Sequence, residues 1–338
     1  MPLHLVQISR GGERRVAVVR EPDLVLLKKV DSVVELAQRA LAEKNTLTAM
    51  TQKLLSGDTL RYDDLVEGRS PWRLLAPVDV PGDSQRVLVS GTGLTHLGSA
   101  RDRQAMHVAP TAEEEARMTD SMRMFEWGRQ NGRPAEGSIG IAPEWFYKGD
   151  GSVVRGPLDA LLIPGYSEDG GEEAELAAIY LITDDGTPWR LGMTTGNEFS
   201  DHVFERLNYL NLAGSKLRTC SIGPELVVDG DFSDVTGSVR ILRDGETLWS
   251  KEIRTGEKNM CHSLANLEHH HFKFAGHRQP GTVHIHFMGA DCLSYGEGVR
   301  LEAGDVTVVH FDGFGRALRN VITREAPLTA PIRVMLMQ

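Results

Sequence analysis

Apolar residues are spaced along the first part of the chain in two ways, which predict strands followed by a helix. Residues 4 to 28 hold short apolar runs, including Val16 to Val19, and the pair Gly11-Gly12 between two runs is typical of a hairpin turn. Residues 32 to 35, Ser-Val-Val-Glu, have the spacing of a capping box, and apolar residues follow at helical intervals. We therefore predict two or three strands and then one helix over residues 32 to 55.

The remainder of the chain is richer in strand signals than in helix signals. Its apolar runs are short, many contain β-branched or aromatic residues, and turns that contain glycine separate them. Strands are predicted over residues 87–89, 143–149, 173–182, 189–195, 225–253, 283–287 and 306–311. Helices are predicted over residues 111–127, 199–214 and 262–274.

These elements predict an α+β protein that is rich in β-strand. A chain of 338 residues is long enough to bury a large core. Pro71, Pro77 and Pro81 interrupt the pattern just before a new strand, which favours a domain boundary near residue 80. We expect a small N-terminal domain over residues 1–80 and a larger domain over residues 81–338.

The composition is that of an ordinary globular protein, and it narrows the choice of partners. Hydrophobic residues make up 41% of the chain, and the formal net charge is -10. This charge disfavours nucleic acid and anionic membrane as partners, and no apolar run reaches the ~18 residues of a membrane span. Cys220, Cys261 and Cys292 are far apart, and the N-terminus lacks the pattern of a signal peptide. We therefore expect a cytoplasmic protein.

Two glutamates at the start of one predicted strand are the main candidates for chemistry. Glu173 and Glu175 are two positions apart, so on a strand they share a face, and two close carboxylates repel unless a cation or a proton lies between them. The predicted hairpin returns Glu198 to the same place. Three carboxylates suit a hard divalent cation such as Mg2+. The alternative is a solvated acidic edge.

Two further residues are candidates for this site. His96 follows a glycine-rich turn after the strand at residues 87–89, where it is placed to act as a general base. The alternative is a histidine that packs or hydrogen-bonds locally. Lys148 ends an aromatic strand and is a candidate for binding a carboxylate substrate, and the alternative is an exposed strand end.

Seven of the twelve histidines lie between His262 and His286. His284 and His286 share a face of one predicted strand, as ligands of a transition metal would. Against this, the three successive histidines from His269 to His271 point about 100° apart on a helix, so they do not all bind one ion. A histidine metal site is therefore kept as a weaker alternative to the carboxylate site.

Taken in order, several segments of the chain resemble the fumarylacetoacetate hydrolase superfamily. The resemblance covers residues 86–325, and its details are most similar to the branch of arabinonate-pathway dehydratases. The segments that carry it are Ser90–His96, Phe146–Lys148, Glu173–Ala177, Gly196–His202, Lys216, Gly223-Pro224, Asn266–His271, Pro280–Val283, Gly304-Asp305 and Asp312–Gly315.

The resemblance implies a fold and a site. The implied fold is a rolled, mostly antiparallel β-sheet or barrel, preceded by a small N-terminal α+β domain. The implied site binds Mg2+, with Mn2+ or Ca2+ as alternatives, and the implied assembly is a homodimer. The implied metal ligands are Glu173, Glu175 and Glu198, the catalytic residues His96 and Lys216, and the substrate-binding residues Lys148, Gly196 and Asn197.

The sequence departs from the superfamily pattern at several positions of this site. The family threonine after a late glycine is Ala290 here, and Ser90, Thr92 and Gly93 replace the family's glycine, asparagine and tyrosine in the loop of His96. The third metal ligand, Glu198, is an aspartate in most of the superfamily, so its side chain is longer by one methylene. The glutamate that usually follows the histidine is missing after His96, which leaves that histidine without its usual activating partner unless Glu114 or Glu115 folds over it.

The resemblance also implies a reaction. We expect a Mg2+-dependent dehydratase that converts a 2-keto-3-deoxypentonate to the semialdehyde of 2-oxoglutarate through a metal-stabilised enolate. One alternative is a metal-dependent C–C hydrolase or lyase of a 2,4-dioxo acid. Another is a binding protein that keeps the fold without the activity. In each case the partner is a small anionic 2-oxo acid.

Overall fold

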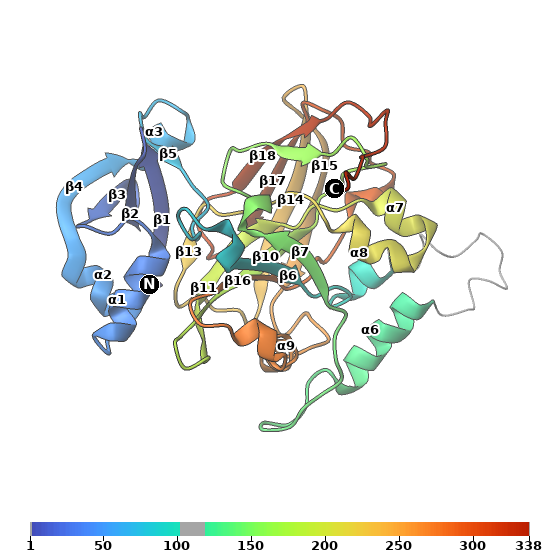
Figure 1. Ribbon diagram of the computed structural model, residues 1–338, viewed down its shortest axis with the longest axis horizontal. Coiled ribbons are helices and arrows are strands. Elements are labelled where there is room, and N and C mark those ends of the chain that lie inside the picture. The colour runs from blue at the N-terminus through green and yellow to red at the C-terminus, as the bar shows by residue number, and fades with distance from the viewer. Residues whose placement is uncertain (1, 102–118, 338) are drawn as a thin grey trace.

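The computed structural model describes residues 2–101 and 119–337, which form two β-sheets and several helices (Figure 1). The N-terminal elements are β1 (His4–Arg10), β2 (Glu13–Arg20), β3 (Asp23–Leu27), α1 (Val33–Ala42), α2 (Leu47–Leu54), β4 (Leu55–Arg61), α3 (Tyr62–Val66) and β5 (Arg73–Leu74). The central elements are β6 (Val87–Gly91), α6 (Asp120–Asn131), β7 (Phe146–Asp150), β8 (Val154–Arg155), β9 (Leu161–Ile163), β10 (Ala174–Ile182), β11 (Pro188–Asn197), α7 (His202–Leu207), α8 (Leu212–Ser215), β12 (Cys220–Ile222) and β13 (Leu226–Val227). The C-terminal elements are β14 (Val235–Arg243), β15 (Glu246–Thr255), α9 (Leu264–Phe272), β16 (Val283–Phe287), β17 (Val306–Phe311) and β18 (Leu318–Arg324).

The strand order confirms a β-rich α+β fold with mostly antiparallel pairing. The larger sheet has 13 strands and the path β4-β3-β2-β1-β13-β11-β10-β16-β6-β7, and the smaller has 5 strands in the order β15-β14-β17-β18-β9. Parallel pairs occur between β16 and β6, β12 and β8, and β18 and β9. Among the described residues no pairing joins the ends of either sheet, so the barrel form of the expectation is not confirmed.

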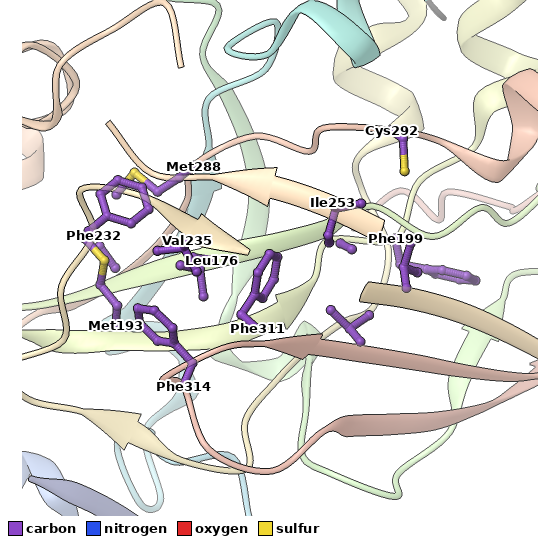
Figure 2. Packing of buried hydrophobic residues seen from close by; sticks show 14 of the residues in the cluster. Leu176, Met193, Phe199, Phe232, Val235, Ile253, Met288, Cys292, Phe311 and Phe314 are labelled. Atoms are coloured by element: carbon purple, nitrogen blue, oxygen red, sulfur yellow. The ribbon is translucent and has the colours of Figure 1, made fainter. Parts of the chain in front are cut away.

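Strand β10 lies at the centre of the protein and is buried on both faces. Leu176, Ala178 and Tyr180 on one face belong to a core shared with the smaller sheet. Figure 2 shows Leu176 in this core with Val235 and Phe311 of the smaller sheet. The residues of the opposite face pack in a second core with α1 and the N-terminal strands. Two covered faces explain why β10 has no exposed position.

The N-terminal hairpin is confirmed, but the single helix predicted over residues 32 to 55 is wrong. Ser32 does cap α1, since its hydroxyl accepts a hydrogen bond from the backbone N–H of Glu35. The chain leaves the helical path after α1 because Lys44 adopts a left-handed conformation, with φ of 52°. Thr46 then caps the separate helix α2. Helix α2 ends at Leu54, close to the predicted end of the helix, and residues 55 to 61 continue as a strand.

The other predicted helices are confirmed in part. Helix α9 lies within the predicted range and is capped by Ser263. Residues 111–118 lie outside the described part of the chain, and the helix seen there begins at Asp120 with Thr119 as its cap. The helix predicted over residues 199–214 is two short helices, because Asn208 between them is extended and its side chain caps the next turn.

The N-terminal elements join the larger sheet directly. His4 and Leu5 of β1 pair with Val227 and Leu226 of β13, so the sheet continues from one predicted domain into the other. A separate apolar cluster, which includes Ile8, packs within the N-terminal elements. The boundary near residue 80 stays a prediction. None of the helices in the described residues is long and apolar enough to span a membrane.

Candidate metal centre

The hairpin of β10 and β11 brings three glutamates together at its open end. Ala174 pairs with Asn197, which places Glu173 opposite Glu198 one position further along. The backbone continues the ladder there, because the N–H of Glu198 donates to the carbonyl of Glu173 at 2.9 Å. Glu175 shares the face of Glu173, as the two-residue spacing predicts. Each carboxylate offers an oxygen that lies within 4.8 Å of the others.

All three carboxylates belong to buried residues, each of which is at most 3% exposed. Burial raises the pKa of Glu175 well above its usual value, and the charges of Glu173 and Glu198 raise it further. The N–H of Gly289 opposes this by donating to Glu175 Oε2 at 2.6 Å. The site therefore disfavours three negative charges unless a cation accompanies them.

Two buried lysines supply part of that positive charge. Lys216 Nζ lies 2.6 Å from Glu173 Oε1 and 2.7 Å from Glu198 Oε2, so its ammonium bridges the two opposed carboxylates. Lys148 Nζ lies 2.6 Å from the other oxygen of Glu198. Burial lowers the pKa of Lys148 despite the raising effect of Glu198. The sequence placed both lysines near the site but did not predict that they share one carboxylate.

The ammonium of Lys148 has three partners within the protein, one ion pair and two hydrogen bonds. Besides Glu198, it donates to the carbonyls of Phe199 at 2.8 Å and Lys216 at 2.9 Å. Phe199 has a left-handed backbone, with φ of 58°, which turns the chain directly after Glu198. Lys148 therefore holds this turn and its glutamate together. Its predicted role in binding a substrate carboxylate stays a prediction.

His202 is a member of the site to which the sequence interpretation gave no role. Its Nε2 lies 3.1 Å from Glu173 Oε1, and the residue is fully buried. Burial alone would lower the pKa of His202, but the hydrogen bond and charge of Glu173 outweigh it, so the pKa is raised. Gly171 leaves room for this ring, because a Cβ there would lie 2.2 Å from His202 Nδ1. The only sequence signal was the position of His202 four residues after Glu198.

His96 lies in the loop after β6, and two threonines fix its tautomer. Thr95 Oγ1 donates to the carbonyl of Met288 at 2.9 Å, so it accepts from His96 Nδ1, which is also 2.9 Å away. His96 Nε2 then carries the lone pair and accepts from Thr255 Oγ1 at 3.1 Å. Burial lowers the pKa of His96 to about 4, so the ring is neutral near pH 7.

The loop of His96 reaches the metal centre through Gly289. A Cβ on Gly289 would lie 1.9 Å from Thr95 Oγ1, and the backbone φ of Gly289 is +97°. Both observations require glycine at this position. The same residue donates to Glu175, so it joins the histidine loop to the carboxylates. Glu114 and Glu115, which the sequence left open as partners of His96, lie outside the described residues.

Gly196 and Asn197 support the site from the end of β11. Asn197 Oδ1 accepts from the N–H of Glu173 at 3.2 Å, and Asn197 Nδ2 donates to Thr307. A Cβ on Gly196 would lie 2.6 Å from the ring of Phe287, so glycine permits close packing there. Both residues therefore hold the hairpin in position, and their predicted contact with substrate stays a prediction.

The histidine cluster forms a hydrogen-bonded chain of neutral rings. Trp145 Nε1 donates to His271 Nδ1 at 3.2 Å, so the N–H of His271 is on Nε2 and donates to His284 Nδ1 at 2.8 Å. His286 is held by Ser90 and Thr92 through its two ring nitrogens. In residues 2–101 and 119–337, the glutamates of the metal centre are the one group with converging ligand atoms, so the histidine metal site is not supported.

Several solved structures have the same fold as this chain. A 2-keto-3-deoxyarabinonate dehydratase matches with a TM-score of 0.70 at 18% sequence identity, over 95% of this chain and 99% of its own. The chain has the fold of the fumarylacetoacetate hydrolase superfamily. The resemblance seen in the sequence is therefore confirmed at the level of the fold. No protein-family model matches the sequence, and no curated protein does.

Two other structures with the fumarylacetoacetate hydrolase fold bear on the site. A 2-keto-3-deoxy-D-arabinonate dehydratase complexed with magnesium and 2,5-dioxopentanoate matches with a TM-score of 0.69 at 18% identity, over 96% of this chain and 99% of its own. A 5-carboxymethyl-2-hydroxymuconate delta-isomerase from Mycobacterium smegmatis matches with a TM-score of 0.57 at 19% identity, over 96% of this chain and 99% of its own. The fold thus accommodates more than one reaction.

The carboxylates of this chain fit a divalent metal on chemical grounds. They offer only oxygen ligands, which Mg2+ prefers, and they are buried, which limits competition from bulk water. The raised pKa of Glu175 has mutual repulsion of the carboxylates among its causes, and a bound cation would relieve that repulsion. Glu173, Glu175 and Glu198 are therefore a candidate site for a divalent metal.

Proposed function

We propose that the protein is a Mg2+-dependent dehydratase of a 2-keto-3-deoxy sugar acid, with a 2-keto-3-deoxypentonate as substrate. The observation that carries the proposal is the group of three buried glutamates at the open end of one hairpin, two of which, Glu173 and Glu198, are bridged by Lys216. The similarity of the fold to dehydratases of this substrate class supports it. The product would be 2,5-dioxopentanoate, the semialdehyde of 2-oxoglutarate.

The glutamates and Lys216 have separate roles in this proposal. Glu173, Glu175 and Glu198 would hold the metal, which when bound supplies a Lewis acid for the oxygens of a 2-oxo acid. Lys216 adds a fixed positive charge next to two of these carboxylates, where it favours negative charge developing on the substrate.

His96 is the base in this proposal. Its ring is neutral near pH 7, and its Nε2 carries the lone pair that takes the proton from C3 of the substrate. The protonated His96 returns this proton to the C4 hydroxyl, which leaves as water, and the C3–C4 double bond that forms tautomerises to the semialdehyde. Thr255 holds this nitrogen before the substrate arrives, and Thr95 fixes the tautomer that leaves it unprotonated.

The surroundings of His96 favour dehydration over C–C hydrolysis. Hydrolysis of a 2,4-dioxo acid needs a water molecule activated as a nucleophile, for which a histidine paired with a carboxylate is suited. The hydrogen-bond partners of the His96 ring in the described residues are two threonine hydroxyls, Thr95 and Thr255. These hydroxyls orient the ring, while the charge of Asp291 raises the pKa of His96 without outweighing burial, so within the described chain the ring lacks the carboxylate partner that the activation of a water nucleophile requires.

The test is to incubate the purified protein and Mg2+ with a 2-keto-3-deoxypentonate and, separately, with a 2,4-diketo-3-deoxypentonate. We expect 2,5-dioxopentanoate from the first, and Glu173→Gln should lower kcat at least ~100-fold while Glu168→Gln, an exposed carboxylate nearby, leaves it unchanged. Pyruvate with a two-carbon acid from the second would favour the hydrolase. Metal affinity unchanged in Glu173→Gln, with no turnover of either compound, would favour a binding protein.

A further inference from the structure

A hollow of about 530 Å³ lies beside the turn of the N-terminal hairpin, and arginines supply all of its charged lining. They are Arg10, Arg14 and Arg73, and no acidic residue of the described chain lines it. The whole chain has a formal net charge of -10, so this concentration of positive charge is local. None of the described lining residues belongs to the metal centre. The hollow is therefore a separate candidate for ligand binding, and its charge favours an anion.

The pairing of β5, β1 and β2 places two of these arginines on one face of the sheet. Arg73 of β5 is the partner of Ser9 of β1, and Ser9 is in turn the partner of Arg14 of β2. Residues directly opposite one another on neighbouring strands share a face, so the three side chains form one row. Neighbouring strands lie about 4.8 Å apart, which places the two arginine backbones about 10 Å apart. The row therefore forms a cradle with a small serine between two cations.

Arg73 carries hydrogen-bond donors that the described chain does not use. Its Nε donates to Ser9 Oγ at 3.1 Å, which holds the side chain along the row. In residues 2–101 and 119–337, its two terminal nitrogens have no acceptor, and no carboxylate pairs with it. Ser9 is 9% exposed and accepts from Arg73, so its own hydroxyl proton remains available to a ligand.

Two further residues of the lining have donors to spare. Ser70 Oγ accepts from the backbone N–H of Trp72 at 3.1 Å, and its hydroxyl donates to no other described residue. Arg14 donates through Nε to the carbonyl of Asp31 and through Nη2 to Asp79, which leaves Nη1 for a ligand. A lining that offers unused donors and no acidic side chain suits an oxyanion.

Ion pairs within the protein explain Arg10 and Arg14 but not Arg73. Arg10 pairs with Glu13 at 2.9 Å and lies over the ring of Trp72, and Arg14 pairs with Asp79 at 2.6 Å. Both pairs are partly exposed, so each contributes little to stability and leaves its arginine able to contact a ligand as well. Arg73 has no such partner in the described chain, so a bound anion would supply it.

We propose that this hollow binds the phosphate group of a small phosphate monoester. Arg73 presents the two ends of its planar guanidinium to the phosphate, Ser9 and Ser70 donate from their hydroxyls, and Arg14 adds a second positive charge. A phosphate monoester has three terminal oxygens and a charge of about -1.5 to -2 near pH 7, so it accepts more of these hydrogen bonds than a carboxylate does.

The size of the hollow accommodates more than the phosphate group. Small-molecule sites have volumes of about 300–1,000 Å³, and this hollow lies within that range. At the hairpin turn, a Cβ on Gly11 or Gly12 would meet no atom within 4 Å. The hollow is therefore open on that side, where the organic part of the ester would lie. The proposal does not depend on which reaction the metal centre performs.

The experiment measures binding of glycerol 3-phosphate to the full chain by isothermal titration calorimetry. Buffer without divalent metal and of low ionic strength keeps the phosphate from binding through a metal at the glutamates and limits screening of the arginines. We expect one saturable site per chain with a Kd below about 1 mM. Glycerate, which carries a carboxylate on a similar polyol, should bind at least ~10-fold more weakly.

Variants of Arg73 test whether its guanidinium recognises the phosphate. Arg73→Gln should weaken binding at least ~10-fold, because it removes charge-assisted hydrogen bonds. Arg73→Lys keeps the charge but loses the planar fork, so it should recover only part of the affinity. Arg20→Gln changes the net charge equally at an exposed arginine of β2 outside the lining, and it should leave the Kd unchanged. Circular dichroism checks that every variant is folded.

Hydrogen exchange with and without glycerol 3-phosphate locates the bound ester. Exchange should slow in residues 9–14 and 70–75 and stay unchanged in residues 173–175. No saturable binding up to about 10 mM overturns the proposal. Equal losses in Arg73→Gln and Arg20→Gln, which would show attraction to net charge alone, overturn it as well. So do equal affinities for glycerate and glycerol 3-phosphate, or protection confined to the glutamates of the metal centre.

Discussion

Lys216 balances part of the charge of the three glutamates in the candidate metal site, with one ammonium group between two opposed carboxylates. Its Nζ contacts Glu173 and Glu198, and all three side chains are buried, so solvent does not screen them. Its ammonium also lies 4.7 Å from the centroid of the Phe146 ring. The lysine therefore acts on stability before it acts on any substrate.

Replacing this lysine should make stability depend on metal. Lys216→Met leaves two carboxylates without their shared cation, so we expect a loss of about 3–5 kcal/mol in the free energy of unfolding. Added Mg2+ should restore a large part of it, because a divalent cation supplies the missing charge. Urea unfolding with and without Mg2+ measures both effects. Lys53→Met, at an exposed pair with Glu43, should cost less than about 1 kcal/mol and show no metal dependence.

The sequence predicts some residues of this site and not others for a physical reason. Glu173 and Glu175 share a face because strands have a period of two, and a hairpin turn returns Glu198, so local pattern suffices. His202 and Gly289 reach the site only through tertiary packing, which no local period encodes. Lys148 bound to Glu198 depends in the same way on how β7 meets the hairpin.

At the scale of elements, helix α9 and strand β16 carry the neutral histidines that lie against one another. His271 comes from α9, whereas His284 and His286 come from β16. Burial, aided by the neighbouring histidines, lowers the pKa of His284 and of His286 to about 3. The pKa of His271 is lowered as well, by burial and then by neighbouring histidines.

This cluster predicts a loss of stability in mild acid. The unfolded chain binds protons on these histidines below about pH 6.5 and the folded chain does not, so their contribution is complete above pH 6.5 and falls as pH falls towards 3. At pH 5 each should cost about 2 kcal/mol relative to pH 7.5. Urea unfolding at both pH values checks this. His284→Asn should reduce the difference by that amount, while His269→Asn, on the exposed side of α9, should not.

Element boundaries show where sequence patterns stop being informative. The capping signals of Ser32 and Ser263 are local, and both helices begin where they predict. The break at Lys44 is not visible in the pattern, because lysine rarely adopts a left-handed backbone and apolar residues continue beyond it at helical spacing. The break at Asn208 is similar, since asparagine occurs within helices and at caps.

At the scale of the whole molecule, one arginine links the N-terminal elements to the loop between β17 and β18. Arg316 donates two hydrogen bonds of 2.8 Å to Glu21 and one of 2.7 Å to Asp63, and it stacks on the ring of Tyr62. Its backbone N–H donates to the buried Glu225. These contacts join parts of the chain that are distant in sequence.

Removing this link should loosen the N-terminal elements selectively. Arg316→Met loses partly exposed ion pairs and one ring contact, so we expect about 1–2 kcal/mol of global destabilisation. Hydrogen exchange should accelerate more in β1 to β3 than in β10. Arg254→Met, at an exposed arginine on β15, should leave both measurements unchanged. Equal acceleration in β1 and β10 would show that the two regions unfold together and that Arg316 is no selective link.

The class of the fold could be predicted from the sequence, but the order of the strands in the sheets could not. The alternation of apolar residues and the short runs predict a β-rich α+β protein, which the structure confirms. The path that places β13 between β1 and β11 depends on contacts between residues far apart in the chain, such as His4 with Val227. Such pairings are decided by packing across the whole chain, which no local pattern of apolar residues encodes.

The hairpin that carries the glutamates has a consequence for the order in which the protein folds. Its turn lies between Ile182 and Pro188, and its open end pairs Ala174 with Asn197, beyond which Glu173 and Glu198 face one another. Like charges directly opposite one another resist strand pairing until a cation arrives. Pairing should therefore start at the turn and proceed towards the glutamates, and the metal centre should be the last part of its own hairpin to close.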